Sequence, residues 1–219
     1  MSTTVFFDHL GGPIEPRRNT VLLTNLPPDA TIQTLLDRMM ICAPFGRLYS
    51  AHLHKTNTPR GSGPPVVRAL VAFFTTDSAQ NLISYVNGPG IVFRRCILAA
   101  DWSNIRVPEN DYPDHRDASR SVIVSGPKFQ VNKRDIISLL ENTNLMANYH
   151  NIQTRDKRSE HQVLLVFTTY TAASQAVRTI RANRPGISAV YGRDPMEFGV
   201  TTKISSTDRN KLSINFGRW

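Results

Sequence analysis

The stretch Val21-Leu22-Leu23-Thr24-Asn25-Leu26, which runs directly into Pro27-Pro28, decides how the chain is read. Its aliphatic and β-branched residues predict a short strand, and the prolines predict a turn that ends it. A helix capped by Asp29 or Thr31 is expected next. The apolar face of this helix is formed at helical spacing by Ile32, Leu35, Leu36 and Met39. The chain therefore opens its first folded block with a strand and a helix.

The rest of this block supplies three further strands and a second helix. The turn Phe45-Gly46-Arg47-Leu48 leads into a strand over about 48–55, and a Gly/Pro/Ser-rich loop at 56–65 precedes a third strand over about 66–74. A helix is expected over about 78–86 and a fourth strand over about 96–101. The order β-α-β-β-α-β is that of the ferredoxin-like fold.

A second block repeats this order. Strands are expected over about 121–125, 151–155 and 162–168, with helices over about 133–142 and 172–181. Ala79 comes six residues after Phe73, and Ala173 comes six residues after Phe167, which indicates a duplication. The predicted fold class is α+β, with two ferredoxin-like βαββαβ domains in tandem. Each is expected to be a four-stranded antiparallel sheet backed by two helices.

Charge and proline content divide the 219 residues further. The formal charge is +9, and two basic blocks flank an acidic stretch that carries Pro108 and Pro113. We therefore expect an N-terminal extension at 1–17, a first domain at 18–106, a linker at 107–118, a second domain at 119–200 and a tail at 201–219. No apolar run approaches the ~20 residues that span a bilayer, and the first ten residues lack the features of a secretory signal. An intracellular location, in the nucleus or the cytoplasm, is expected.

Both blocks resemble RNA-recognition motif (RRM) domains. In the first, residues 21–26 match the family's hexamer on the first strand, and residues 66–73 match its octamer on the third. Residues 45–48 match its helix-to-strand turn and residues 83–88 the end of its second helix, whereas the second block matches more weakly at 122–127 and 160–167. The Leu-Pro turn, the Gly-Ser-rich hairpin and Arg193-Asp194-Pro195 also resemble fungal proteins with degenerate tandem RRMs.

The resemblance implies binding of single-stranded RNA, yet the residues that carry this function in the family differ here. An RRM stacks bases on aromatic rings at the second hexamer position and at the third and fifth octamer positions, and each stacked base contributes about 1–3 kcal/mol. No ring stands at these positions in either block. They are occupied by Leu22, Arg68 and Leu70 in the first domain and by Ile123, Gln162 and Leu164 in the second.

Other side chains are candidates to replace the rings on the first domain. If Val67, Ala69, Val71 and Phe73 point into the core, strand alternation leaves the intervening residues on the open face. In the fourth strand we expect Leu98, Ala100 and Trp102 to face outward. The predicted RNA contacts are Leu22, Asn25, His52, His54, Arg68, Leu70 and Trp102. The alternative is that Trp102 folds back over the sheet edge and that both histidines are only solvated.

The second domain has two candidate surfaces. Arg155, Lys157, Arg158 and Gln162, with basic residues at 128, 133 and 134, either meet phosphates or form a solvated face. Aliphatic Ile123 and Leu164 indicate a covered sheet, with the linker, the other domain, the tail or a partner chain as the cover. The tail alternates over 212–216, which predicts an edge strand, with a disordered chain end as the alternative. Arg218-Trp219 resembles the Arg-Trp ligands of protein-binding RRMs.

Enzymatic chemistry is not indicated. The Gly-rich stretches at 11–13 and 61–65 lack the spacing of a phosphate loop or a dinucleotide fingerprint. Cys42 and Cys96 have no CxxC partner and are expected to be buried reduced thiols; His52 and His54 lack a third metal ligand, and no cofactor is expected. The predicted function is non-catalytic binding of single-stranded RNA in a ribonucleoprotein setting. The alternative is a protein–protein adaptor that binds peptides or protein partners through Ile123, Leu164 and Trp219.

Overall fold

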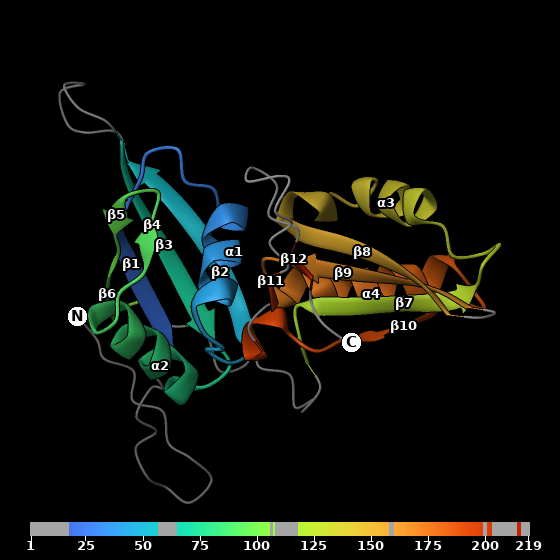
Figure 1. The fold of residues 1–219 in the computed structure, drawn as a ribbon. Coiled ribbons are helices and arrows are strands. Elements are labelled where there is room, and N and C mark those ends of the chain that lie inside the picture. Colours follow the sequence, from blue (N-terminus) through green and yellow to red (C-terminus); the bar gives the residue numbers. More distant parts are fainter. Residues whose placement is uncertain are drawn as a thin grey trace, which may run out of the picture.

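The computed structural model describes residues 18–56, 65–105, 107, 118–157, 160–198, 201–202 and 214–215. Within these residues the chain forms two four-stranded antiparallel sheets, each with two helices on one face (Figure 1). The predicted pair of tandem βαββαβ units is confirmed. Candidate residues Arg158 and Trp219 lie outside the described residues.

The first sheet has the strand order β2-β3-β1-β6. Its unit consists of β1 (Thr20–Leu26), α1 (Ile32–Cys42), β2 (Leu48–Thr56), β3 (Val66–Phe73), α2 (Thr76–Asn87), β4 (Val92–Phe93), β5 (Cys96–Ile97) and β6 (Ala99–Trp102). β4 and β5 pair with each other as a small separate hairpin. The strand predicted over 96–101 is therefore divided at Leu98, and only β6 joins the sheet.

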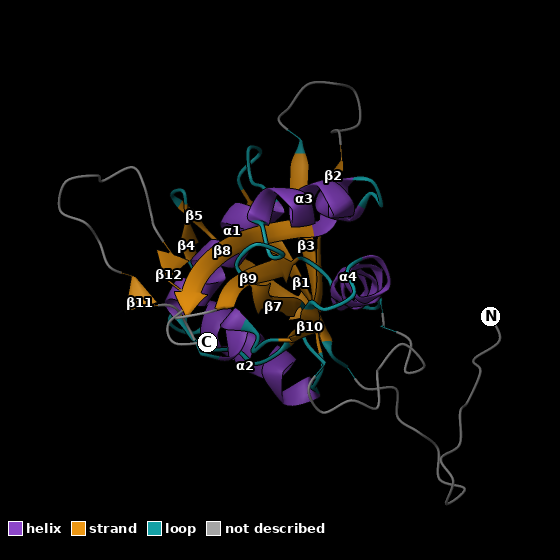
Figure 2. Cartoon of the chain, turned by 90° about the vertical axis from the view of Figure 1, so that its right-hand side faces the viewer, coloured by secondary structure: helices purple, strands orange, loops and turns teal. Residues whose placement is uncertain are grey.

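The second sheet has the equivalent order β10-β7-β9-β8, and Figure 2 shows both of its helices on the same side. Its unit consists of β7 (Ser121–Pro127), α3 (Lys133–Glu141), the short 3-10 helix η2 (Leu145–Asn148), β8 (Tyr149–Lys157), β9 (Glu160–Phe167), α4 (Tyr170–Asn183), β10 (Ser188–Tyr191) and the 3-10 helix η3 (Pro195–Glu197). In the tail, β11 (Thr201–Thr202) pairs with β12 (Ile214–Asn215) rather than with an edge of either sheet.

Local sequence explains the ends and the inner face of α1. Thr31 is its N-cap: the Thr31 hydroxyl accepts from the backbone N–H of Thr34, and the Thr34 hydroxyl oxygen accepts from the backbone N–H of Thr31. The helix buries Leu35, Leu36 and Met39 against the first sheet, as the spacing predicts. In the part of the chain that the structure describes, no helix is long and apolar enough to cross a membrane.

A segment after β10 joins the two domains, and we call residues 192–198 the crossover segment. It leaves the second sheet and places Met196, which is fully buried, in the hydrophobic core of the first domain. The Met196 carbonyl accepts from the backbone N–H groups of Phe45 and Gly46 at 2.9 and 3.2 Å. The core of the first domain is therefore completed by a residue from the C-terminal end of the second domain.

A buried ion pair fixes the crossover segment in place. Arg120 and Asp194 are both fully buried, and Arg120 Nε donates to the two Asp194 carboxylate oxygens at 3.1 Å. Asp194 also accepts from the backbone N–H groups of Leu48 at 3.1 Å and Met196 at 2.9 Å. The carboxylate thus bridges both domains and the crossover segment, with its charge matched by a guanidinium.

His150 extends this network to α1. Arg120 Nη1 lies 3.2 Å from His150 Nδ1, and His150 Nε2 lies 2.9 Å from an Asp37 carboxylate oxygen. Because an arginine can only donate, Nδ1 of His150 accepts from Arg120, and the protonated Nε2 donates a hydrogen bond to the Asp37 carboxylate. Burial, followed by the charge of Arg120, lowers the pKa of His150 despite the opposing hydrogen bond to Asp37. The junction therefore holds the imidazole in its neutral form.

Candidate nucleic-acid interface

The open face of the first sheet brings together most of the side chains that sequence analysis selected on that domain. Cross-strand pairing aligns His52 with Leu70, Leu70 with Leu22, and His54 with Arg68. The two histidines and Arg68 are exposed, whereas Leu22 and Leu70 are half-buried. The expected inward orientation of Val67, Ala69, Val71 and Phe73 is confirmed by their burial. A continuous surface of imidazole, guanidinium and aliphatic groups results.

Trp102 does not belong to this surface, so its expected outward orientation is wrong. In the ladder, Trp102 pairs with Val21 and Ala100 pairs with Leu23, and both β1 partners are fully buried core residues. Leu98 is likewise buried, and Trp102 packs half-buried against the same core. Paired residues on adjacent strands share a face, which puts Ala100 and Trp102 on the helix side, and the burial of Leu98 in the same core excludes it from the open face as well. The alternation expected for the fourth strand is therefore reversed, and the residues expected to face outward face the core.

Asp101, rather than Ala100 or Trp102, is the residue of β6 that faces outward on the open face. It is exposed and pairs with Leu22, in the row that also contains Leu70 and His52. A carboxylate at this position repels phosphate groups and accepts hydrogen bonds from base amino groups or ribose hydroxyls. The centre of the face is therefore suited to base and sugar edges rather than to the RNA backbone.

The two histidines and the end of β1 contribute different chemistry. Partial desolvation by its neighbours lowers the pKa of His52 although the side chain is exposed, and the nearby charge of His54 lowers it further. His52 is consequently a neutral flat ring at physiological pH, available for stacking and hydrogen bonding. Asn25 is exposed, has a φ of 60° and stands at a break in the β1–β3 register between Leu23 and Leu26. Asn25 therefore lies outside the regular pairing that aligns Leu22, Leu70 and His52.

One end of this open face is closed by the second domain. Ser50, Ala72 and Thr20 form the last row of the face and are all buried. Ala72 packs in a cluster with Tyr49, Tyr170 and Ala118. The rings of Tyr49 and Tyr170 lie 6.0 Å apart between centroids. The accessible part of the face is therefore the part that contains His52, His54 and Arg68.

The open face of the second sheet is covered. Leu164 is 2% exposed, Val166 is 0% exposed and Gln162 is 8% exposed, although strand alternation puts all three on the side opposite the helices. A Cβ atom at Gly192 would lie 3.0 Å from Cγ1 of Ile123 and 3.6 Å from Cδ1 of Leu164. The crossover segment therefore starts directly against this face, which confirms the expectation of a covered sheet. The cover had not been assigned to this segment from the sequence.

The basic hairpin of the second domain carries acidic residues beside its basic ones. Arg155 is exposed and pairs across the sheet with buried Gln162. Lys128 lies 3.7 Å from Asp156, whose other partner is His161 Nδ1 at 2.7 Å. The hydrogen bond from His161 and then the charge of Lys128 lower the pKa of Asp156. The backbone of Lys157 pairs with that of Glu160 in the β8–β9 ladder.

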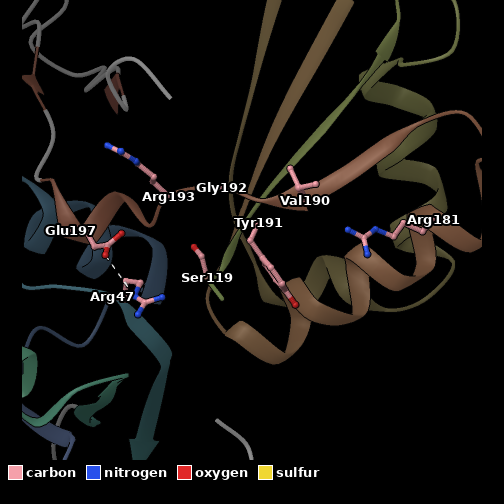
Figure 3. Close-up of a pocket in the computed structure, with 8 residues that line it drawn as sticks. All are labelled: Arg47, Ser119, Arg181, Val190, Tyr191, Gly192, Arg193 and Glu197. Atoms are coloured by element: carbon pink, nitrogen blue, oxygen red, sulfur yellow. Dashed lines mark ion pairs between the residues drawn. The ribbon is translucent and has the colours of Figure 1, made fainter. Parts of the chain in front are cut away.

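Sequence analysis missed a cavity of about 550 Å³ at the domain junction, shown in Figure 3. Arg47, Arg181 and Arg193 line it together with Glu197. The remaining wall consists of Ser119, Val190, Tyr191 and Gly192. Because these residues come from separate segments of both domains, no local motif could have indicated the site. Burial, followed by the charge of Asp194, raises the pKa of Glu197.

Comparisons with known proteins find likeness only among solved structures. No model of a known protein family and no curated protein matches the chain. The crystal structure of the N-terminal three RNA binding domains of the yeast splicing factor Prp24 is 14% identical, with a TM-score of 0.31, and the match covers 80% of this chain and 63% of that one. The chain thus spans less than two thirds of that protein fragment.

Two further structures are similar at the same level. The C-terminal RNA recognition motif of RBM19 is 17% identical with a TM-score of 0.32, and the match covers 52% of this chain and 99% of that one. The C. elegans NONO-1 homodimer is 11% identical with a TM-score of 0.27, and the match covers 79% of this chain and 61% of that one. These identities and scores assign no family, so the function is argued from the site.

Proposed function

We propose that the protein binds single-stranded RNA, without catalysis, on the open face of its first sheet. The observation that carries this proposal is the exposed surface formed by His52, His54 and Arg68 beside Leu22 and Leu70. The resemblance of residues 21–26 and 66–73 to the RRM hexamer and octamer supports RNA as the ligand. Because the open face of the second sheet is covered, we assign the base contacts to the first domain.

Each group on the face has a distinct role in this proposal. His52 stacks on a base as a neutral ring, and the Arg68 guanidinium stacks or contacts phosphate. Leu22 and Leu70 provide apolar contact with base faces, and Asp101 accepts from base amino groups or from the 2′-hydroxyl. Because imidazole and guanidinium replace larger aromatic rings, we expect a footprint of few nucleotides and an affinity below that of an RRM with its rings in place.

The adaptor alternative is disfavoured by the same geometry. Leu164 is buried and Ile123 is approached by Gly192, so these side chains already contact the protein's own crossover segment.

The wider setting is also part of the proposal. It comprises a ribonucleoprotein role, an intracellular location in the nucleus or cytoplasm, and membership among fungal proteins with degenerate tandem RRMs.

Fluorescence anisotropy with a randomised single-stranded RNA pool and matched double-stranded DNA, from low to near-physiological salt, tests this function. The double variant His52→Ala/Arg68→Ala is compared with His161→Ala/Arg178→Ala, which removes the same residue types from the second domain. We expect RNA-selective binding that the first variant weakens at least about tenfold and the control changes by less than about twofold. Equal binding of RNA and DNA that salt abolishes, unaffected by either variant, would sink the proposal.

A further inference from the structure

The cavity at the domain junction has cations that are fixed in position before any ligand arrives. Arg47 Nη1 donates to the Ala118 carbonyl at 3.1 Å, and Arg47 Cζ lies 5.3 Å from the centroid of the Phe74 ring. Arg181 Nε donates to the Ala189 carbonyl at 2.9 Å. These contacts orient both guanidinium groups, so little side-chain entropy is lost when they bind an anion.

The charge of the cavity is positive overall. Three arginines and one carboxylate line it, and the carboxylate of Glu197 is paired with Arg47 at 3.6 Å. Arg193, the third arginine, is exposed and lies with its Cζ 5.2 Å from the centroid of the Phe198 ring. Arg181 and Arg193 are both on the second domain, and neither has an ion pair with Glu197. The cavity is therefore expected to attract anions.

The distribution of these charges favours an extended ligand. Figure 3 shows Arg47 and Glu197 at one end of the cavity and Arg181 at the other, with Tyr191 between them. A single compact anion is best held by guanidinium groups that converge on it, whereas separated cations match a chain of phosphates. The cavity also lies beside β10, at an edge of the second sheet.

We propose that this cavity binds the backbone phosphates of a single-stranded RNA that runs along β10, an inference that rests on the proposed RNA-binding function. Contacts to phosphate position a strand without reading its sequence. The cavity therefore holds the strand while the first sheet contacts bases. Inorganic polyphosphate presents the same repeated phosphate chemistry, and the test separates the two sources.

The test measures how the affinity for a fluorescein-labelled oligouridine depends on salt. The variant Arg181→Gln/Arg193→Gln removes two arginines from the cavity, and the matched control Arg95→Gln/Arg178→Gln removes two exposed arginines that do not line it. Each phosphate contact to a single strand contributes about 0.7 to the slope of log K against log salt. We expect the cavity variant to lower that slope by about 1.4 and the control to leave it unchanged. An unchanged slope in the cavity variant, or an equal decrease in both variants, would overturn the proposal.

Two further arms identify the ligand and separate this proposal from the preceding one. Inorganic polyphosphate is added as a competitor and is expected to displace oligouridine only weakly from the wild type, because the bases of the strand are also bound. Complete displacement at equal phosphate concentration would contradict RNA as the ligand. The variant His52→Ala/Arg68→Ala completes the comparison. If it leaves RNA affinity unchanged while Arg181→Gln/Arg193→Gln still lowers the slope, the sheet-face function fails and the cavity site stands. The opposite pattern removes the cavity site and keeps the sheet-face function.

Discussion

Replacing Asp194 with Asn tests whether the buried ion pair holds the two domains together. The carboxylate accepts from Arg120 Nε with both oxygens at 3.1 Å and from the backbone N–H groups of Leu48 and Met196 at 3.1 and 2.9 Å. An amide in its place retains one acceptor oxygen and leaves the fully buried guanidinium without a counter-charge. Loss of one partner from a buried pair costs about 3–5 kcal/mol, which is a large share of the stability of a small protein.

Urea denaturation followed by circular dichroism measures this loss. We expect Asp194→Asn to lower the free energy of unfolding by at least about 3 kcal/mol. The second variant Arg120→Met/Asp194→Asn removes the unpaired guanidinium as well, and is expected to recover at least about 1 kcal/mol of the loss. A loss below about 1 kcal/mol for Asp194→Asn, with no recovery in the double variant, would refute the structural role assigned to the pair.

Three further predictions concern Met196, His150 and Trp102. Met196→Ala should destabilise the first domain by about 2–5 kcal/mol in urea denaturation, because it leaves a cavity in that core; a loss under about 1 kcal/mol would contradict the packing. Because the pKa of His150 is lowered in the folded protein, the unfolded state binds more protons in acid. The free energy of unfolding should therefore fall as the pH drops below about 6.5, by at most about 1.4 kcal/mol per pH unit. The variant His150→Gln should flatten this pH dependence in urea denaturation. Trp102→Ala should cost about 2 kcal/mol of stability and change RNA affinity by less than about twofold; a tenfold loss of affinity in a stable variant would return Trp102 to the binding face.

Local sequence patterns were sufficient for most of the fold. The alternation from Val67 to Phe73 fixed which side of β3 faces the core, and Thr31 supplied the cap of α1. The helical spacing of Leu35, Leu36 and Met39 predicted the buried face of that helix. These features depend on neighbours within a few residues, so a single sequence contains the information needed to predict them.

Long-range pairing accounts for what the sequence did not predict. The face of Trp102 depends on its pairing with Val21, about eighty residues earlier in the chain, and nothing within β6 specifies that register. The partnership of Arg120 with Asp194 likewise joins distant positions.

The Cys42 and Cys96 thiols, expected to be buried, are both half-buried and unpaired, and burial raises the pKa of Cys42.

The most direct test of where RNA binds is a titration of the isotopically labelled protein with a short single-stranded RNA, followed by two-dimensional amide NMR. We expect the shifts to concentrate on the open face of the first sheet, at Leu22, His52, Arg68 and Leu70, with none of comparable size at Ile123 or Leu164. Shifts confined to the second sheet, or the absence of shifts on β1, β2 and β3 at saturating RNA, would contradict this expectation.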